Sequence, residues 1–159
     1  MDPKVIILGL GNTILTDDGV GIYVVREIQK LITNHQSLIT IKEASLGGFN
    51  FIDLLAGFDR AVIVDAIHTK DGRPGEFYEL DITALKPSAR LSSLHQIDFA
   101  TACELAKNMG IDFPGEIAIF VMEVEDEFSF GEKPTSNVEG AISKMANSII
   151  DNLKNRNWI

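Results

Sequence analysis

The sequence has one cysteine and no long apolar run, and both shortages restrict what the chain can be. With Cys103 alone, no disulfide can form within the chain, which suits a reducing compartment and favours a cytoplasmic protein. No apolar run approaches the roughly 18 residues that a membrane-spanning helix needs. Residues 1–4 pass straight into an apolar segment without the pattern of a signal peptide. We therefore expect neither export nor a membrane partner.

Basic residues are also few, with 14 Lys and Arg against 23 Asp and Glu and a formal net charge of −9. No cluster of Lys or Arg offsets this charge locally, so nucleic acids and anionic membranes would be repelled. If charge contributes to recognition, the docking face of the partner is basic. Simple solubility explains the same excess equally well.

Motifs of two common hydrolase classes are missing. A serine hydrolase would need a G-x-S-x-G elbow, and the sequence has none. Cys103 lies in the middle of an expected helix with apolar neighbours such as Ala102 and Ala106, which predicts packing rather than a nucleophile.

The glycine-rich segment after the first expected strand also differs from the motifs of two protein families, one that binds dinucleotides and one that binds magnesium. A dinucleotide fingerprint requires G-x-G-x-x-G, but Ile14 stands where the third glycine belongs. A signalling receiver domain carries its acidic pair directly on the end of the first strand. Here a seven-residue loop intervenes, and no lysine follows the last strand. Both interpretations are therefore disfavoured.

Apolar segments alternate between strand and helix character along residues 1–159. We expect one domain, an α/β three-layer sandwich whose mostly parallel, twisted sheet of about five strands has helices on both faces. Residues 76–82 read as a half-exposed edge strand, and Ser136 to Glu139 has the spacing of a capping box. The expected strands are 5–8, 38–41, 61–66, 76–82 and 116–124, and the expected helices are 20–32, a short one around 49–58, 97–109 and one from 136 to 153.

Two acidic residues follow expected strand ends. Asp18 lies in the glycine-rich segment Gly9 to Gly21, and Asp65 closes an apolar strand. Ligands of open α/β sheets bind beyond the carboxyl ends of the strands, and the first and third strands are natural neighbours. The sequence thus places two carboxylates in one crevice.

Each candidate also has a purely structural interpretation. Asp17 and Asp18 could cap the following helix, whereas Asp65 ends a buried strand and needs a cation or a set of donors nearby. His95 opens a later helix, His68 could flank the same crevice, and His35 lies in a polar loop typical of the surface. One imidazole with two carboxylates suits nickel, zinc, iron or cobalt better than calcium or magnesium.

These motifs together resemble the hydrogenase maturation endopeptidases over essentially the whole chain. The matching elements are Gly-Leu-Gly-Asn with Asp-Asp-Gly-Val-Gly after the first strand, Val-Asp-Ala at the end of a later strand and Ser-x-x-His before a helix. Pro74-Gly75 and the segment from Gly131 to Glu139 also match.

The resemblance implies an endopeptidase that removes a short C-terminal extension from the precursor of a nickel–iron hydrogenase large subunit after nickel insertion. It implies that Asp18, Asp65 and His95 contact the metal and form the catalytic site. Nickel would be shared with the precursor, other divalent transition metals could substitute, and Asp18 and Asp65 are alternative general bases. A loop corresponding to Ser45-Leu46-Gly47-Gly48 would contribute to the cleft, although the Ser-Leu pair departs from the family pattern.

A different class of function uses the same three residues. A non-catalytic nickel-binding assembly factor would escort a hydrogenase subunit in a stable one-to-one complex, whereas a protease turns over. The sequence has no coiled-coil repeat, so we expect a monomer that meets its partner transiently. The cognate hydrogenase is not encoded in any readable motif.

Overall fold

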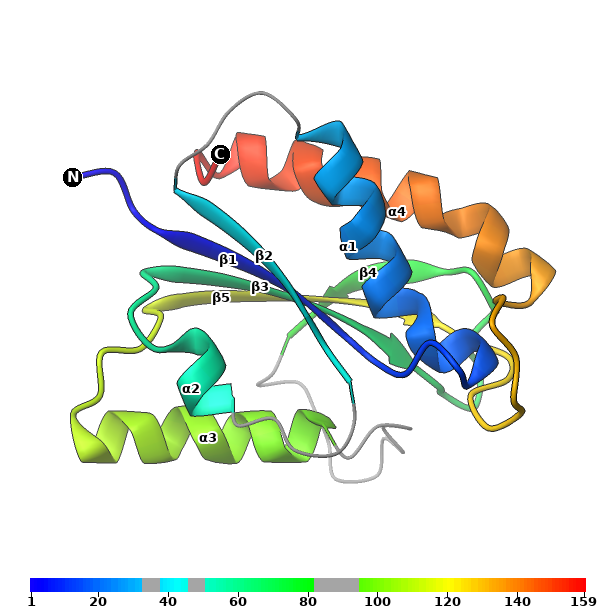
Figure 1. Ribbon diagram of the computed structural model, residues 1–159, viewed down its shortest axis with the longest axis horizontal. Coiled ribbons are helices and arrows are strands. Elements are labelled where there is room, and N and C mark those ends of the chain that lie inside the picture. Colours follow the sequence, from blue (N-terminus) through cyan, green and yellow to red (C-terminus); the bar gives the residue numbers. More distant parts are fainter. Residues whose placement is uncertain (33–37, 46–50, 82–94) are drawn as a thin grey trace.

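The computed structural model describes residues 1–32, 38–45, 51–81 and 95–159. For residues 95–101 it describes the backbone only. The described residues form one five-stranded sheet in the order β2-β1-β3-β5-β4 (Figure 1). The strands are β1 (Val5–Leu10), β2 (Ile39–Ala44), β3 (Arg60–Ile67), β4 (Phe77–Leu80) and β5 (Glu116–Glu123). The helices are the 3-10 turn η1 (Thr16–Gly19), α1 (Val20–Leu31), α2 (Phe51–Leu55), α3 (His95–Met109) and α4 (Ser136–Asn155).

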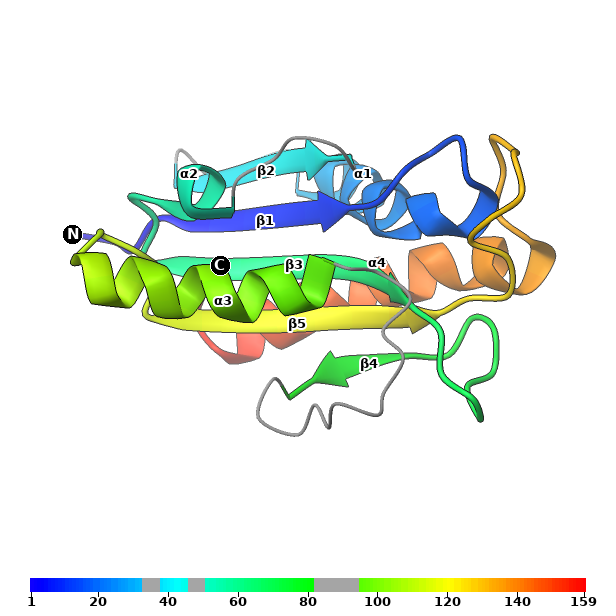
Figure 2. The same cartoon turned by 90° about the horizontal axis from the view of Figure 1, so that it is seen from below.

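The sheet lies between two helical layers, as the sequence predicts. Helices α1 and α4 cover one face, and α2 and α3 cover the other (Figures 1 and 2). Four strands are parallel, and only β4 is antiparallel, at the edge beside β5. Among the described residues no helix is long and apolar enough to cross a membrane.

Each strand divides its side chains between two cores. In β1, Val5 and Ile7 pack with α1 and α4, whereas Ile6 and Leu8 pack with the α2–α3 layer. Successive side chains of a strand point to opposite faces, so an apolar residue is needed at every position of a doubly covered strand. This explains the continuously apolar runs of β1, β3 and β5.

Two expectations about the elements need correction. Strand β2 extends to Ala44 rather than stopping at residue 41, because it pairs in register with β1 as far as Leu10. Its last polar residues, Lys42 and Glu43, are tolerated because β2 is an edge strand. The predicted capping box is absent: α4 begins after Thr135, and no side chain caps its first turn.

Helix α1 lies very close to the sheet at its first turn. A Cβ atom at Gly21 would overlap the carbonyl oxygens of Leu10 and Val64, on two neighbouring strands. A Cβ atom at Gly9 would likewise collide with the carbonyl of Gly21. These glycines therefore set how deeply the β1–α1 connection, with Asp17 and Asp18, sits on the edge of the sheet.

Candidate active site

Two loops are joined by hydrogen bonds at the carboxyl ends of the parallel strands. They are the β1–α1 loop (residues 11–19) and the β5–α4 loop (residues 124–135) (Figure 1). Leu15 and Gly131 form a parallel bridge, and the Thr16 amide donates to the Gly131 carbonyl at 2.9 Å. Thr16 adopts a φ of +45°, which is uncommon for a non-glycine residue. Its hydroxyl donates to the Ser129 carbonyl at 2.6 Å and holds this conformation.

The buried side chain of Asp17 holds these two loops together. Its carboxylate is fully buried and accepts the amides of Glu125 at 3.0 Å, Asp126 at 2.9 Å and Thr135 at 2.6 Å. The Thr135 hydroxyl lies at 2.9 Å from the same group. A structural role was predicted for Asp17, but its partners are in the β5–α4 loop, more than 100 residues away, and not in its own helix.

Asp18 is also buried, but within the described residues its carboxylate is less fully hydrogen-bonded than that of Asp17. Only 7% of the residue is exposed, and within the described part of the chain its Oδ2 atom has no hydrogen-bond partner. Burial raises the pKa of the Asp18 carboxyl, the amide of Asn12 opposes this by donating to it, and the charge of Glu127 raises it further. Since no side chain caps η1 or α1, the capping interpretation of Asp18 does not hold. The group is a desolvated carboxylate suited to binding a cation or accepting a proton.

Asp65 reaches the same edge from the neighbouring strand. Strands β1 and β3 pair directly, with Gly9 opposite Val64, so Asp65 lies where the β1–α1 loop begins. It is 1% exposed, and its Oδ1 accepts the amide of Ala66 at 2.8 Å. By the alternation along β3, its side chain is on the α2–α3 face of the sheet. The predicted convergence of the two strand ends is confirmed.

A histidine and a glutamate extend this acidic edge. His68 follows β3 directly, and its Nδ1 lies 2.9 and 3.0 Å from the two carboxylate oxygens of Glu127. The Glu127 side chain is 5% exposed, whereas that of His68 is about half exposed. His68 thus contacts Glu127, whose charge acts on Asp18.

Within the described residues, every buried charged side chain is a carboxylate at this edge: Asp17, Asp18, Asp65, Glu123 and Glu127. Glu123 accepts the amide and hydroxyl of Thr69 and the hydroxyl of Tyr78. The bond to Glu123 and burial both raise the pKa of Tyr78, with burial as the larger cause. The edge therefore concentrates negative charge and attracts cations.

The side chain of His95 lies outside the described residues, as do residues 46–48 of the glycine loop and His35. The backbone of α3 begins at His95 on the carboxyl-end side of the sheet and runs back toward the amino ends (Figure 2). His95 is thus on the same side and same face as Asp65. Among the side chains that the structure describes, no group of three His, Cys, Asp or Glu is placed to hold a metal ion.

Sequence reasoning missed Glu127 and Glu123. Both belong to the acidic stretch from Glu123 to Glu127, and nothing in the sequence distinguishes its buried members from its exposed ones, which the structure shows. Cys103 behaves as predicted: it is partly buried against the α2–α3 core, and burial raises the pKa of its thiol.

Comparison with known proteins finds relatives of this chain. A family model described as hydrogenase maturation protease matches residues 22–152. A hydrogenase expression/formation protein, HupD, from Rhizobium leguminosarum bv. viciae is 27% identical over 142 residues, which cover 88% of this chain and 69% of the relative.

Solved structures share the fold. The hydrogenase maturating endopeptidase HybD from Escherichia coli superposes with a TM-score of 0.78 at 22% identity, covering 96% of this chain and 93% of the other. The [NiFe] hydrogenase maturation protease HycI from Thermococcus kodakarensis gives a TM-score of 0.72 at 21% identity, with the same coverage.

Proposed function

Because this chain belongs to the hydrogenase maturation protease family, we propose that it removes the C-terminal extension of a nickel–iron hydrogenase large-subunit precursor after nickel insertion. The observation that carries this proposal is Asp18, a buried carboxylate one of whose oxygens has no partner among the described residues, at the sheet edge that also holds Asp65. Burying a charge without a partner costs several kcal/mol, on the order of the penalty for other unpaired buried ions. A cation arriving with the substrate would remove that penalty.

In this proposal nickel belongs to the substrate. Two carboxylates and one imidazole, from Asp18, Asp65 and His95, leave coordination positions free for groups of the precursor. Such an incomplete site binds free metal weakly and completes its coordination against a nickel-bearing precursor. An empty precursor lacks the bridging ion, so metal loading controls cleavage. Other divalent transition metals with similar ligand preferences would substitute.

The protein's own groups then supply proton transfer. Asp18 and Asp65 are alternative general bases for the attacking water, and the raised pKa of Asp18 makes it a stronger base than an ordinary aspartate. His68 lies beside these groups, and its Nδ1 is hydrogen-bonded to Glu127. We expect the enzyme to act as a cytoplasmic monomer that meets its precursor transiently.

The test is the intact mass of candidate precursors from the same organism, nickel-loaded and nickel-free, after incubation with substoichiometric protein. Loss of a C-terminal peptide from the loaded form alone supports both the protease and the metal control. Cleavage of both forms keeps the protease and removes the metal control. Stable one-to-one binding without cleavage would identify the assembly-factor alternative.

A single substitution tests whether His95 takes part in processing. His95→Ala should abolish processing of the loaded precursor while the circular dichroism spectrum and thermal unfolding stay unchanged, because α3 keeps its other packing contacts. The matched control is His68→Ala, which retains the three proposed metal contacts and keeps measurable processing. Normal processing by folded His95→Ala protein would exclude the histidine from the site.

A further inference from the structure

Three exposed apolar side chains gather on the two joined loops. Phe128 and Phe130 are 79% and 86% exposed, and Ile14 is 51% exposed. The amide of Gly131, directly after Phe130, donates to the Ile14 carbonyl at 2.9 Å. We call Ile14, Phe128 and Phe130 the apolar tip. Single exposed apolar residues need no explanation, but two aromatic rings beside an isoleucine on adjoining loops do.

The backbone of the apolar tip is ordered by hydrogen bonds. The Asp126 Oδ1 atom accepts the amides of Phe128 at 3.1 Å and Ser129 at 2.9 Å. Asp17 holds the start of the same loop by accepting the Asp126 amide, and the Thr16 hydroxyl donates to the carbonyl of Ser129, the residue between the two phenylalanines. The loop thus has an ordered backbone and exposes both rings instead of burying them. Prior ordering of this kind lowers the entropic cost of binding a partner.

The tip is continuous with the candidate active site. Phe128 follows Glu127, whose charge acts on Asp18, and Ile14 is in the same loop as Asp17 and Asp18. The apolar tip and Asp18 therefore lie on the same two joined loops, so a molecule bound at the tip is near Asp18. Both loops lie at the end of the molecule opposite the amino terminus (Figure 1).

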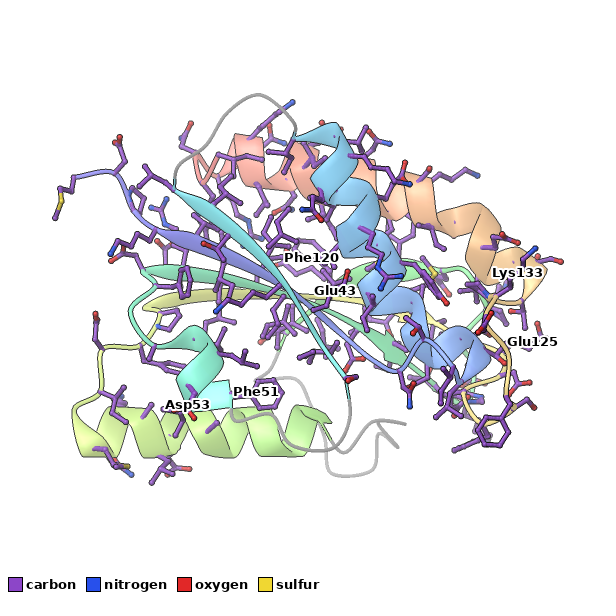
Figure 3. All side chains as sticks on the ribbon, in the orientation of Figure 1. Glu43, Phe51, Asp53, Phe120, Glu125 and Lys133 are labelled. Atoms are coloured by element: carbon purple, nitrogen blue, oxygen red, sulfur yellow. The ribbon has the colours of Figure 1, made fainter. Side chains whose placement is uncertain are left out.

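The charge around the tip is negative. Glu125, Asp126 and Glu132 surround it, and Lys133 is the single basic residue of residues 124–135. Glu125 and Lys133 lie at this end of the molecule (Figure 3). A partner that fits this surface has an apolar depression flanked by Lys or Arg side chains, in keeping with the net charge of −9.

We propose that the apolar tip is the docking surface for the hydrogenase large-subunit precursor, which receives the two phenyl rings in an apolar depression with a basic rim. This inference rests on the proposed function, because that function supplies the partner. Docking here positions the precursor with its cleavage point at the edge formed by Asp18 and Asp65. Exposed aromatic anchors of this kind commonly dominate binding energy at interfaces.

The test uses the double variant Phe128→Ala/Phe130→Ala with nickel-loaded precursor. Loss of two aromatic anchors should raise KM and the Kd for the precursor by about tenfold or more, while the single-turnover rate at saturating precursor stays within about twofold. Raising the salt concentration should weaken wild-type binding, because the rim contacts are charged. Thermal unfolding of the variant should match the wild type, since both rings are exposed.

The matched control is Leu31→Ala/Met109→Ala, which removes two exposed apolar side chains at the ends of α1 and α3. This control should leave KM and Kd unchanged. Unchanged KM and Kd in the phenylalanine variant would overturn the docking proposal while leaving the protease intact. Loss of a concentration-dependent dimer in that variant, with KM unchanged, would instead assign the tip to self-association.

Failure of the proposed function has a different signature. If wild-type protein neither binds nor cleaves any loaded precursor from its own organism, the proposed function fails, and the docking proposal fails with its named partner. If the wild type cleaves and only the tip variant loses affinity, both proposals are supported.

Discussion

Asp17 and Asp18 are adjacent buried carboxylates with opposite energetic roles. Asp17 accepts three backbone amides and a hydroxyl, so its charge is fully compensated. Asp18 accepts the amide of Asn12, its Oδ2 has no partner among the residues that the structure describes, and the charge of Glu127 acts on it. Substituting each residue by asparagine should therefore change stability in opposite directions.

Asp18→Asn should stabilise the fold at neutral pH. The folded-state pKa of Asp18 lies above its ordinary value of 3.8, so the folded protein binds more protons than the unfolded chain, and stability is lost as the pH rises through this window. The amide removes that cost and directs an N–H toward Glu127. We expect a gain of about 1 kcal/mol, or a Tm about 2–4 °C higher, with loss of processing. Thermal unfolding at several pH values checks this, and the gain should shrink toward about pH 4; a lower Tm at pH 7 would contradict it.

Asp17→Asn should destabilise the fold at every pH at which it is folded. Both carboxylate oxygens accept backbone amides, so the side-chain amide of asparagine would face one of these donors in either orientation. We expect a loss on the order of 3 kcal/mol in urea unfolding. Amide hydrogen exchange of Glu125, Asp126 and Thr135 should also accelerate. Unchanged exchange at these amides would show that the loop is held by other contacts.

Sequence reasoning placed Asp18 after the first strand and Asp65 near the end of the third, because strand ends are readable from apolar runs. It misassigned the partners of Asp17, since the donors come from residues 125–135 and no local pattern reveals a contact across 118 residues. For the same reason Glu127 and its bond to His68 were not foreseen.

At the scale of elements, the contact between α1 and the sheet decides where the site lies. Gly21→Ala should cost several kcal/mol, roughly as in other overpacked sites, because its Cβ would overlap two backbone carbonyl oxygens that cannot move independently. Gly140→Ala is the matched control: this glycine is in α4 with open space around it, and alanine should add about 0.5–1 kcal/mol. Urea unfolding of both variants measures the difference, and equal stabilities would contradict the close-packing account.

The buried elements were the most predictable. Strands β1, β3 and β5 carry continuous apolar runs because both faces are covered, and their predicted limits differ from the observed ones by no more than two residues. The edge strand β2 was shortened in the prediction because its half near Lys42 and Glu43 carries no apolar signal. The first turn of α4 was given a capping box, yet Thr135 bonds to Asp17 instead, which is a tertiary contact overriding a local preference.

At the scale of the whole molecule, Trp158 closes the α1–α4 core at the edge away from the candidate site. It is 6% exposed, its amide donates to Leu153 at 2.9 Å, and the guanidinium groups of Arg60 and Arg156 lie 5.4 and 5.6 Å from its ring centroid. The chain end packs beside the amino ends of the strands (Figure 1).

Trp158→Ala should lower the free energy of unfolding by about 3–5 kcal/mol, because it leaves a cavity and removes both cation–π contacts. Processing measured well below the unfolding transition should stay near the wild-type rate, since the site is at the opposite edge. Circular dichroism during urea unfolding gives the stability, and Trp158→Phe should lose less. A large loss of kcat in the folded variant would contradict the separation of core and site.

The hydrogen bonds between Asp17 and Thr135 also determine when the site forms during synthesis of the chain. Residues 11–19 leave the ribosome early, but the loop that orders them is made more than 100 residues later. Chains are synthesised from the amino terminus, and contacts distant in sequence form late. A nascent or truncated chain that lacks residues 124–135 therefore carries Asp18 and Asp65 without the frame that aligns them. The site can therefore be aligned only after residues 124–135 have been synthesised.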